Sequence, residues 1–475
     1  MSRPLAALLA ALFLAPLALP APGGAAARSP AVDRSAAAHG RREPNARHRG
    51  AAPPAALSAL DLIALEICYT TVLARYYEPV DPAALLGGAR TGIVAYLAGR
   101  GIPNPAIPLA PAHADRWRAE NAIDRDVALA VARYGRRVRP DELVADTIAG
   151  ELAVLHDPYS VLFRPRAYKR FVGFLDGTAT GGIGAELDVD PQSHDVRVVD
   201  VFPGSPAEAA GILPGDRIAA IDGNAPATGV PGAVQAALRG RPGTTVRLTI
   251  VRDGATLAPL ALVRRAIVPA DATGRLLPDG IGYVRLRSFG AESAAQVSAV
   301  LAKLAAASPR GYVLDLRANG GGYRDAAVAV ASHFVRGTVV TTRERGAPPR
   351  AFAADPSTPR IAAPLAVLID GDTASAAEIL AGAIQDDHAG TLVGARTFGK
   401  GLVQETFALP DGGAIKLTTA VYRTPAGRDI EHVGISPDVP VAEPAGSHVG
   451  EPGHDPQLDR ALALLSGSAT PAPAR

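Results

Sequence analysis

Ser375 has the side chain and the setting of a nucleophile. It follows the apolar run Leu365–Asp370 and a few small residues, and it opens a segment predicted to be helical. The first turn of a helix has unpaired backbone N–H groups, and its dipole favours negative charge. The N–H of Ala376 could therefore stabilise an oxyanion formed when Ser375 attacks a carbonyl group. The plainer alternative is that Ser375 only caps the helix.

Lys400 is the candidate base for this serine. A lysine can act as a base once burial or nearby positive charge favours its neutral form, whereas an arginine cannot. The chain has 48 lysines and arginines, and only four of them are lysines. Lys400 lies between two glycines, in a segment suited to a tight turn, and Gln404 could hold its amine by a hydrogen bond. The alternative is a surface lysine in a glycine loop.

A glycine-rich loop, Asp315–Gly322, supplies a third component. It follows a strand-like run, and its glycines allow backbone N–H groups to point into a site. A phosphate-binding loop is the alternative, but the Gly-Lys-Ser/Thr ending and the Gly-x-Gly-x-x-Gly order are both missing.

Strands and helices alternate around these residues, which predicts an α/β domain with its site at strand-to-helix turns. The predicted strands are Ile281–Leu286, Gly311–Asp315 and Leu365–Asp370, and the predicted helices are Ala291–Ala306, Asp325–Phe334 and Ser375–Ala389. We place this domain at residues 267–442. A tail over residues 443–475 follows, with one short helix, Gln457–Leu465.

A smaller β-rich domain is predicted over residues 170–266. Its strands are Ala185–Val189, Val196–Val201, Arg217–Ile221 and Thr245–Arg252. Gly182, Ile183 and Gly184 precede the first strand and could present backbone N–H groups to an anion. A free strand edge beside them could capture a peptide C-terminus, with Ile183 touching its terminal side chain. The alternative is an ordinary glycine turn.

The region 57–165 is predicted to be helical, and it contains an internal repeat. Ala74-Arg75-Tyr76 recurs 58 residues later as Ala132-Arg133-Tyr134, and Gly92 matches Gly150 at the same spacing. Each copy reads as a helix, a proline-containing turn and a second helix, which indicates a duplicated helical hairpin. Chance similarity in an alanine-rich sequence is the alternative.

The N-terminus predicts export. Arg3, the apolar run Leu5–Leu19 and the small residues that follow have the order of a signal peptide, which we place at residues 1–27. Residues 28–56 then form a flexible linker. The apolar run is shorter than the roughly 20 residues that span a bilayer. An uncleaved membrane anchor at residues 5–19 is the alternative to cleavage and release, and a periplasmic location is expected in either case.

Composition limits the remaining choices. The chain has 475 residues, 48% of them hydrophobic, which suits several folded domains. The net charge of +2 excludes a strong nucleic-acid footprint. One cysteine, Cys68, allows neither an internal disulfide nor a cysteine-rich zinc site.

Several motifs then resemble a known family. Those of the small domain are similar to a bacterial PDZ domain, and they lie at Gly181–Ala185, Gly204–Ala207, Gly215–Ile218 and Ile221–Gly223. After it come Asp-Leu-Arg-x-Asn-x-Gly-Gly from Asp315, Thr-Ala-Ser-Ala-x-Glu from Thr373 and Thr-Phe-Gly-Lys-Gly-x-x-Gln from Thr397. This order, over about residues 130–440, resembles the carboxyl-terminal processing (tail-specific) serine proteases.

The resemblance implies a multidomain α+β protein with a helical N-terminal region, a PDZ small β-barrel and an α/β protease domain. It implies Ser375 as nucleophile, Lys400 as base, and Gln404 as the residue that orients Lys400. The oxyanion donors would be Ala376 and either Gly321 or Gly322. It implies no metal or cofactor, and substrates recognised by their free C-termini. Assembly of copies through the helical region and an activating partner protein are compatible with it.

Two other functions stay open at this point. A Ser-His-Asp hydrolase could use His388 or His432, but Ser375 lacks the Gly-x-Ser-x-Gly elbow of many such enzymes. A non-catalytic PDZ scaffold would not need Ser375, Lys400 and Gln404 together.

Overall fold

The computed structural model describes residues 57–106, 115–176, 180–189, 195–202, 204–228, 233–268, 270–442 and 449–467. It divides into two compact units. Among the described residues, the first consists of those from residue 57 to Leu73, within Val80–Ala167 and in Ala408–Ile415, and the second of those within Ala74–Pro79, Tyr168–Phe407 and from Lys416 to residue 467. The predicted signal peptide and linker lie outside the described residues. Within the described ranges, every helix is too short or too polar to cross a membrane.

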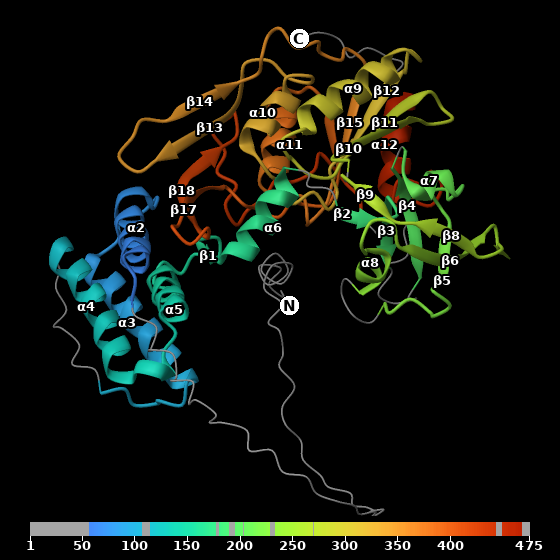
Figure 1. Cartoon of the computed structure of the whole chain (residues 1–475). Coiled ribbons are helices and arrows are strands. Elements are labelled where there is room, and N and C mark those ends of the chain that lie inside the picture. The colour runs from blue at the N-terminus through green and yellow to red at the C-terminus, as the bar shows by residue number, and fades with distance from the viewer. Residues whose placement is uncertain are drawn as a thin grey trace, which may run out of the picture. The chain divides into compact units, whose positions relative to one another are not determined.

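The first unit is helical. Its helices are α2 (Ala59–Arg75), α3 (Pro82–Gly99), α4 (Arg116–Tyr134) and α5 (Pro140–Ala153), with a short 3₁₀ turn η1 (Gly135–Arg137) before α5 (Figure 1). The helices α3 and α5 both start at a proline, which suits the first turn because its N–H would have no partner there. Pro82 and Pro140 are 58 residues apart, the spacing of the predicted repeat.

Helices α3 and α5 pack closely through glycines. A Cβ atom on Gly88 would lie 2.3 Å from the carbonyl oxygen of Gly150, and one on Gly92 would lie 2.1 Å from that of Asp146. The repeat spacing maps Gly88 onto Asp146 and Gly92 onto Gly150, so it exchanges these two contacts. Two similar hairpins related by a local two-fold axis would make such a pair of equivalent contacts. The contacts therefore favour the duplicated-hairpin interpretation.

A carboxyl group is buried inside the helical unit. Glu151 of α5 is 0% exposed, and neither of its side-chain oxygens has a hydrogen-bond partner among the described residues. Burial raises the pKa of Glu151 to about 8, the Cys68 thiol beside it lowers it in part, and the charges of Asp124 and Glu120 raise it further. At neutral pH the folded protein therefore keeps Glu151 mostly protonated.

The stability of this unit should depend on pH through Glu151. The unfolded chain loses this proton near pH 4.5 and the folded chain near pH 8. The contribution of Glu151 to the free energy of unfolding is therefore highest below about pH 4.5. It falls by about 3–5 kcal/mol as the pH rises to 8 and levels off above that. The chain's single tryptophan, Trp117, lies in α4, so its fluorescence during urea unfolding at pH 5 and pH 8 measures the change.

Glu151→Gln should flatten this pH dependence and raise stability at pH 8. The matched control is Asp141→Asn on the same helix, where the carboxylate is 64% exposed and the slope should stay. Equal slopes for wild type and Glu151→Gln would contradict the prediction.

The small β domain lies in the second unit. Its main sheet has the order β3-β4-β5-β6-β7, with β8 also paired to β6, and a separate pair joins β2 to β9. The elements are β2 (Thr180–Gly182), β3 (Ala185–Val189), β4 (Val196–Val201), α7 (Pro206–Ala209), β5 (Arg217–Ile221), α8 (Ala233–Leu238), β6 (Thr245–Arg252), β7 (Ala255–Thr256), β8 (Leu260–Val263) and β9 (Arg265–Ile267). The four predicted strands have their predicted bounds.

Among the described residues, β3 lies at one edge of its sheet. Ile183 is only 3% exposed and packs in the core of the small domain, so its contact with a peptide side chain stays a prediction. Gly184 has φ +78°, and a Cβ atom there would lie 2.3 Å from that of Ser205.

The α/β domain is built on a six-stranded sheet in the order β10-β11-β12-β15-β16-β19. Strand β10 is antiparallel to β11, and the remaining pairs are parallel. The strands are β10 (Ala272–Leu276), β11 (Ile281–Leu286), β12 (Gly311–Asp315), β15 (Leu365–Ile369), β16 (Thr391–Gly394) and β19 (Val439–Pro440).

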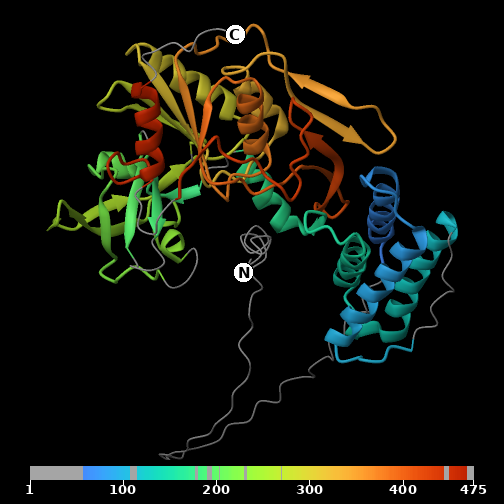
Figure 2. The same ribbon diagram turned by 180° about the vertical axis from the view of Figure 1, so that it is seen from behind.

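Helices cover both faces of this sheet. Helices α9 (Ser293–Ala305), α10 (Arg324–Ala331) and α11 (Ala376–Asp386) pack on one face, and α12 (Pro456–Gly467) packs on the other (Figures 1 and 2). Burial on both sides explains why β15 is apolar throughout and why β11 and β12 are mostly apolar, with Arg285 and Asp315 as their buried charged residues. Because β12 and β15 are adjacent and parallel, the loops after them emerge side by side.

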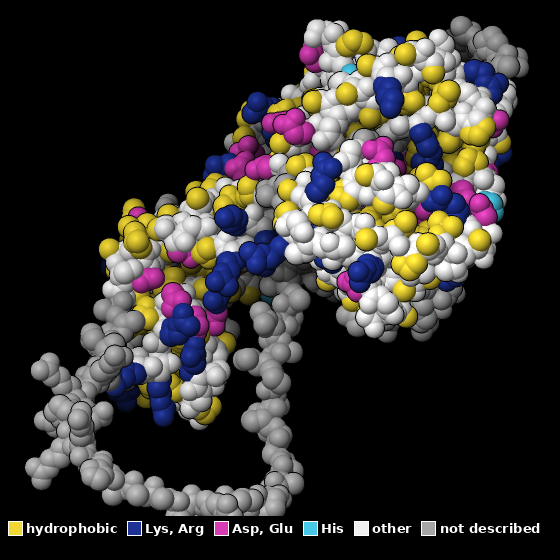
Figure 3. Space-filling view, turned by 45° about the vertical axis from the view of Figure 1, so that its right-hand side comes forward, with side chains coloured by type: hydrophobic (Ala, Val, Ile, Leu, Met, Phe, Trp, Pro, Cys, Tyr) yellow, Lys and Arg dark blue, Asp and Glu magenta, His cyan; other side chains and the backbone are white. Residues whose placement is uncertain are grey.

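A second sheet has the order β1-β18-β13-β14, with β17 also paired to β18. Its strands are β1 (Val161–Phe163), β13 (Thr338–Glu344), β14 (Arg350–Ala353), β17 (Leu402–Ala408) and β18 (Ala414–Arg423), and α6 (Pro165–Leu175) follows β1. On the face shown in Figure 3, acidic and basic side chains lie among each other, and apolar side chains are scattered between them.

Candidate active site

The loops after β12 and β15 are tied together by Asp370 and Thr373. The Asp370 carboxylate accepts the N–H of Thr373 at 2.8 Å and that of Ala318, in the other loop, at 2.9 Å. The Thr373 hydroxyl donates to the carbonyl oxygen of Leu316 at 2.9 Å. These bonds fix the segment that carries Ser375 against the glycine-rich loop.

Ser375 directly precedes α11 and has φ +57° and ψ −117°. This is an uncommon conformation for a residue with a side chain, and such strain persists only where the surroundings enforce it. The N–H of Ala376 has no acceptor among the residues that the structure describes. Ser375 and an unpaired N–H group therefore lie together at the start of the helix, as predicted.

Glu378 links Ser375 to Lys400. It is 0% exposed, and its Oε2 accepts the backbone N–H of Ser375 at 2.8 Å and that of Lys400 at 2.9 Å. Its Oε1 accepts the N–H of Gly399 at 2.8 Å and the hydroxyl of Thr397 at 2.5 Å. Burial raises the pKa of Glu378, and these four bonds lower it in part. One carboxyl oxygen thus holds the two predicted catalytic residues next to each other.

The turn around Lys400 needs its glycines. Gly399 has φ +87°, and a Cβ atom there would lie 2.8 Å from the backbone nitrogen of Gly434. The N–H of Gly401 donates to Glu431 at 2.5 Å. Burial raises the pKa of this carboxyl, and the bond from Gly401 and the charges of His432 and Lys400 lower it in part. Gln404 on β17 donates its hydrogen bond to the Thr418 hydroxyl at 3.3 Å.

The glycine-rich loop lies against Ser375. A Cβ atom on Gly321 would be 2.8 Å from the Cβ of Ser375 and 2.9 Å from the nitrogen of Ala376. Asn319 is fully buried, and its Oδ1 accepts the N–H of Gly321 at 2.9 Å. The N–H of Gly322 has no acceptor within the described ranges. The two glycines therefore differ: the N–H of Gly321 is bonded within the loop, and that of Gly322 has no acceptor among the described residues.

A buried charge cluster supports this loop. Arg317 is 3% exposed, and its guanidinium bonds to Asp315 at 2.6 Å and to Asp455 at 2.7 Å, both fully buried. Burial alone would raise the pKa of Asp315, but the charges of Arg317 and Arg285 hold it well below its usual range. Because Asp455 precedes α12, the cluster joins that helix to the loop.

Arg285 and Arg287 connect the same cluster to the small β domain. Arg285 pairs with Asp315 at 3.3 Å and with Glu186 of β3 at 3.1 Å. Arg287 pairs with Glu186 as well, and with Asp200 of β4 at 2.7 Å. The edge strand of the small domain is thus anchored to the α/β domain by ion pairs.

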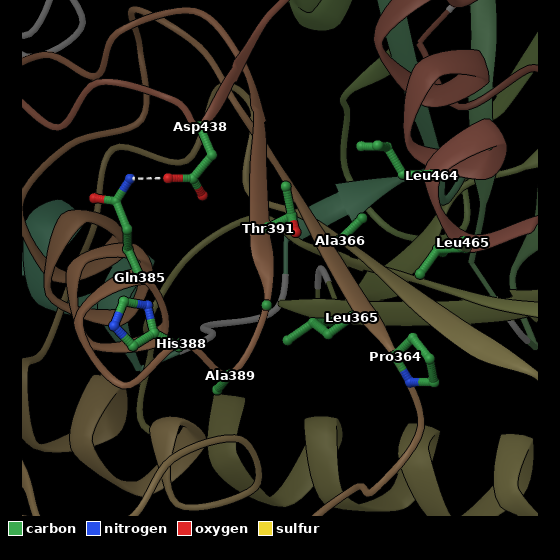
Figure 4. A pocket seen from close by; sticks show the side chains of 11 residues that line it. Pro364, Leu365, Ala366, Gln385, His388, Ala389, Thr391, Asp438, Leu464 and Leu465 are labelled. Carbon is green, nitrogen blue, oxygen red and sulfur yellow. Dashed lines mark hydrogen bonds between the residues drawn. The ribbon is translucent and has the colours of Figure 1, made fainter. Parts of the chain in front are cut away.

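Neither histidine alternative gains support. His388 lies beside Gln385 and Asp438 in a pocket lined by Leu365 and Thr391, which begin β15 and β16 (Figure 4). Ser375 follows the opposite end of β15. The His432 side chain is 85% exposed, and its ring lies 3.4 Å from Glu431. In the described part of the chain, no group of three or more His, Cys, Asp or Glu side chains could hold a metal ion.

Comparison with known proteins agrees with this geometry. The model of peptidase family S41 matches residues 280–441, and a PDZ domain model matches residues 197–252. The carboxyl-terminal-processing protease of Synechocystis is 37% identical over 345 residues, which cover 70% of this chain and 79% of that protein. The chain belongs to the carboxyl-terminal-processing proteases of family S41.

A second protease of this family, from Picosynechococcus, is 38% identical over 328 residues, which cover 68% of this chain and 78% of that protein. The solved photosystem II D1 C-terminal processing protease is 28% identical, with a TM-score of 0.48, and the match covers 86% of this chain and 98% of that one. The predicted family, fold class and enzyme class are confirmed: the chain is a serine-type peptidase with a PDZ domain.

Sequence reasoning about this S41 peptidase missed two parts of the site. Glu378 stands three residues after Ser375, which is the spacing of a helix capping box, and that pattern could have identified it. No sequence signal pairs Arg317 with Asp455, because the contact joins residues 138 positions apart.

Proposed function

We propose that this chain is an exported endopeptidase that uses a Ser375/Lys400 dyad on substrates recognised by their C-termini. The observation that carries the proposal is the Glu378 oxygen shared by the N–H groups of Ser375 and Lys400. A base can take a proton from a nucleophile only within hydrogen-bond reach, directly or through one water molecule. The shared oxygen holds the backbones of Ser375 and Lys400 next to each other, which supports the assignment of their side chains as a dyad.

The reaction runs in two halves. The Ser375 hydroxyl attacks the substrate carbonyl, and its proton passes to the neutral amine of Lys400. The tetrahedral intermediate collapses to an acyl-enzyme, and the leaving amine takes the proton from Lys400. Water then attacks the acyl carbon in the same way, which releases the carboxyl product and restores Ser375.

Two backbone N–H groups are proposed to hold the oxyanion. They are those of Ala376 and Gly322, since Gly321 donates to Asn319 instead. For Gln404 we propose a role in orienting Lys400 once substrate is bound, with Thr418 as its partner in the free enzyme. Backbone groups at Gly182, Ile183 and Gly184 would take the substrate's terminal carboxylate while its last residues pair with β3.

The location and assembly of the enzyme belong to the same proposal. The signal-like N-terminus supports export to the periplasm, with release or anchoring by residues 5–19. Assembly through the helical unit and activation by a partner protein are compatible with this function.

C-terminal recognition is tested with one cleavable peptide in three forms: free acid, C-terminal amide, and N-terminally acetylated free acid. Amidation removes a charge-assisted hydrogen bond and should lower kcat/KM about tenfold or more. Acetylation is the matched chemical control and should leave it unchanged, while Ser375→Ala should cleave none of the three. Equal rates for acid and amide would refute C-terminal recognition.

A further inference from the structure

Tyr422 is hydrogen-bonded to Ser375 and to Gly401, the residue after Lys400. It lies on β18 with a side chain that is 1% exposed. Its phenol hydroxyl donates to the carbonyl oxygen of Ser375 at 3.0 Å, and its backbone N–H donates to the carbonyl oxygen of Gly401, next to Lys400, at 2.8 Å. The side chain of Tyr422 therefore acts on the serine, and its main chain acts on the lysine loop.

The bond to Ser375 holds a particular peptide plane. The carbonyl group of Ser375 and the N–H of Ala376 belong to one peptide unit, which is planar, and in the trans form they point in opposite directions. Whatever fixes the carbonyl oxygen also fixes the direction of the N–H. Ser375 has a positive φ, which is unfavourable for a residue with a side chain. Contacts with other groups are therefore needed to hold the peptide plane in this orientation.

Three groups provide this support. Glu378 accepts the N–H of Ser375 and so fixes the plane before that residue. The plane after it is fixed at its carbonyl oxygen by the Tyr422 hydroxyl and by the backbone N–H of Ile379, each at 3.0 Å. Only the second plane carries the Ala376 N–H, which has no acceptor in the described part of the structure. The hydroxyl of Tyr422 is thus the side-chain group that, together with the N–H of Ile379 in the first turn of α11, sets where this donor points.

We propose that Tyr422 is a positioning residue whose hydroxyl aims the Ala376 N–H at the oxyanion. The inference rests on the proposed function, because it assigns a role within the same site. It is specific to the transition state: the charge on the substrate oxygen develops during attack, so a misdirected donor costs rate and not substrate affinity.

Tyr422→Phe removes only the hydroxyl and keeps the ring and the backbone bond to Gly401. Loss of one complete oxyanion donor costs 10²–10³ in kcat, so a misdirected donor should cost about 10–100-fold. We expect kcat to fall by this factor with KM nearly unchanged. The profile of kcat against pH should keep the same midpoint and have a lower maximum, because Lys400 stays in place.

The matched control is Tyr312→Phe. Tyr312 lies on β12 in the core of the same domain and is 4% exposed, so this variant also deletes a buried phenol hydroxyl. Rates are normalised to active protein by titrating Ser375 with a fluorophosphonate. A variant that folds in part is then still measured per working site.

A second readout separates donor placement from general damage. A synthetic peptide aldehyde with the substrate sequence up to the scissile bond forms an anionic adduct with Ser375. The peptide alcohol of the same sequence cannot form this adduct. The ratio of their affinities should fall with kcat in Tyr422→Phe and stay unchanged in Tyr312→Phe. If Tyr422→Phe lost affinity for the aldehyde and the alcohol by the same factor, or if the midpoint of its kcat profile against pH shifted, the inference would be overturned.

Failure of this inference differs from failure of the proposed function. If wild type cleaves peptides and Tyr422→Phe matches it in kcat and in the affinity ratio, only the role of Tyr422 is refuted. If Ser375→Ala cleaves as well as wild type does, the proposed function falls, and the role of Tyr422 falls with it.

Discussion

Lys400→Arg is expected to reduce peptide hydrolysis by a factor of about 10³ or more. The arginine keeps the positive charge and a similar length, and its backbone N–H can still donate to Glu378. It cannot act as a base, since a guanidinium does not lose its proton in a protein. Lys400→Ala should be equally inactive. Initial rates on one cleavable peptide, with the unfolding curve of each variant, measure the effect.

His432→Ala is the control for this experiment. Its backbone N–H donates to the carbonyl oxygen of Gly399, so it borders the lysine turn, but its side chain is 85% exposed. A protease with a lysine base should keep nearly full activity in this variant. Substantial turnover by Lys400→Arg, or loss of activity in His432→Ala, would favour a histidine base instead.

Arg317→Met should strongly destabilise the α/β domain. The guanidinium of Arg317 lies between the fully buried carboxylates of Asp315 and Asp455, and methionine fills similar space without charge. Removing one partner of a buried ion pair leaves the other charge uncompensated, at a cost of about 3–5 kcal/mol. In this variant Asp315 still has Arg285 as an ion-pair partner at 3.3 Å, so most of the cost comes from the uncompensated charge of Asp455. Chemical unfolding at pH 7 measures the loss.

Arg324→Met provides the comparison. Arg324 pairs with Asp325, whose side chain is 78% exposed, and such a surface pair contributes about 0–1 kcal/mol. The two variants lose the same charge and differ in burial. Similar small losses for both would show that the cluster of Arg317 does not hold the loop to α12.

The strands of this protein could be predicted closely from sequence. Gly311–Asp315 and Ile281–Leu286 have their predicted bounds, and Leu365–Asp370 is one residue longer than the strand observed. Parallel strands buried on both faces are short apolar runs bounded by glycine, proline and aspartate, a local pattern. Helix ends were less accurate: Ser375–Ala389 was predicted, and α11 is Ala376–Asp386. The last turn of a helix depends on capping contacts from elsewhere.

The sequence alone determined the family and enzyme class of this protein and selected its candidate catalytic residues. Ser375 opens a helix after a buried strand, and Lys400 is a rare lysine between glycines, so residue type and local setting sufficed to select both. Only the tertiary structure decided how they are held. Glu378, Tyr422 and Asp455 act through contacts that join distant segments, and the burial of Ile183 and the Thr418 partner of Gln404 also follow from packing. Periodicity and turn residues report each segment's own conformation, whereas contacts between segments are set by how the whole sheet and its helices pack.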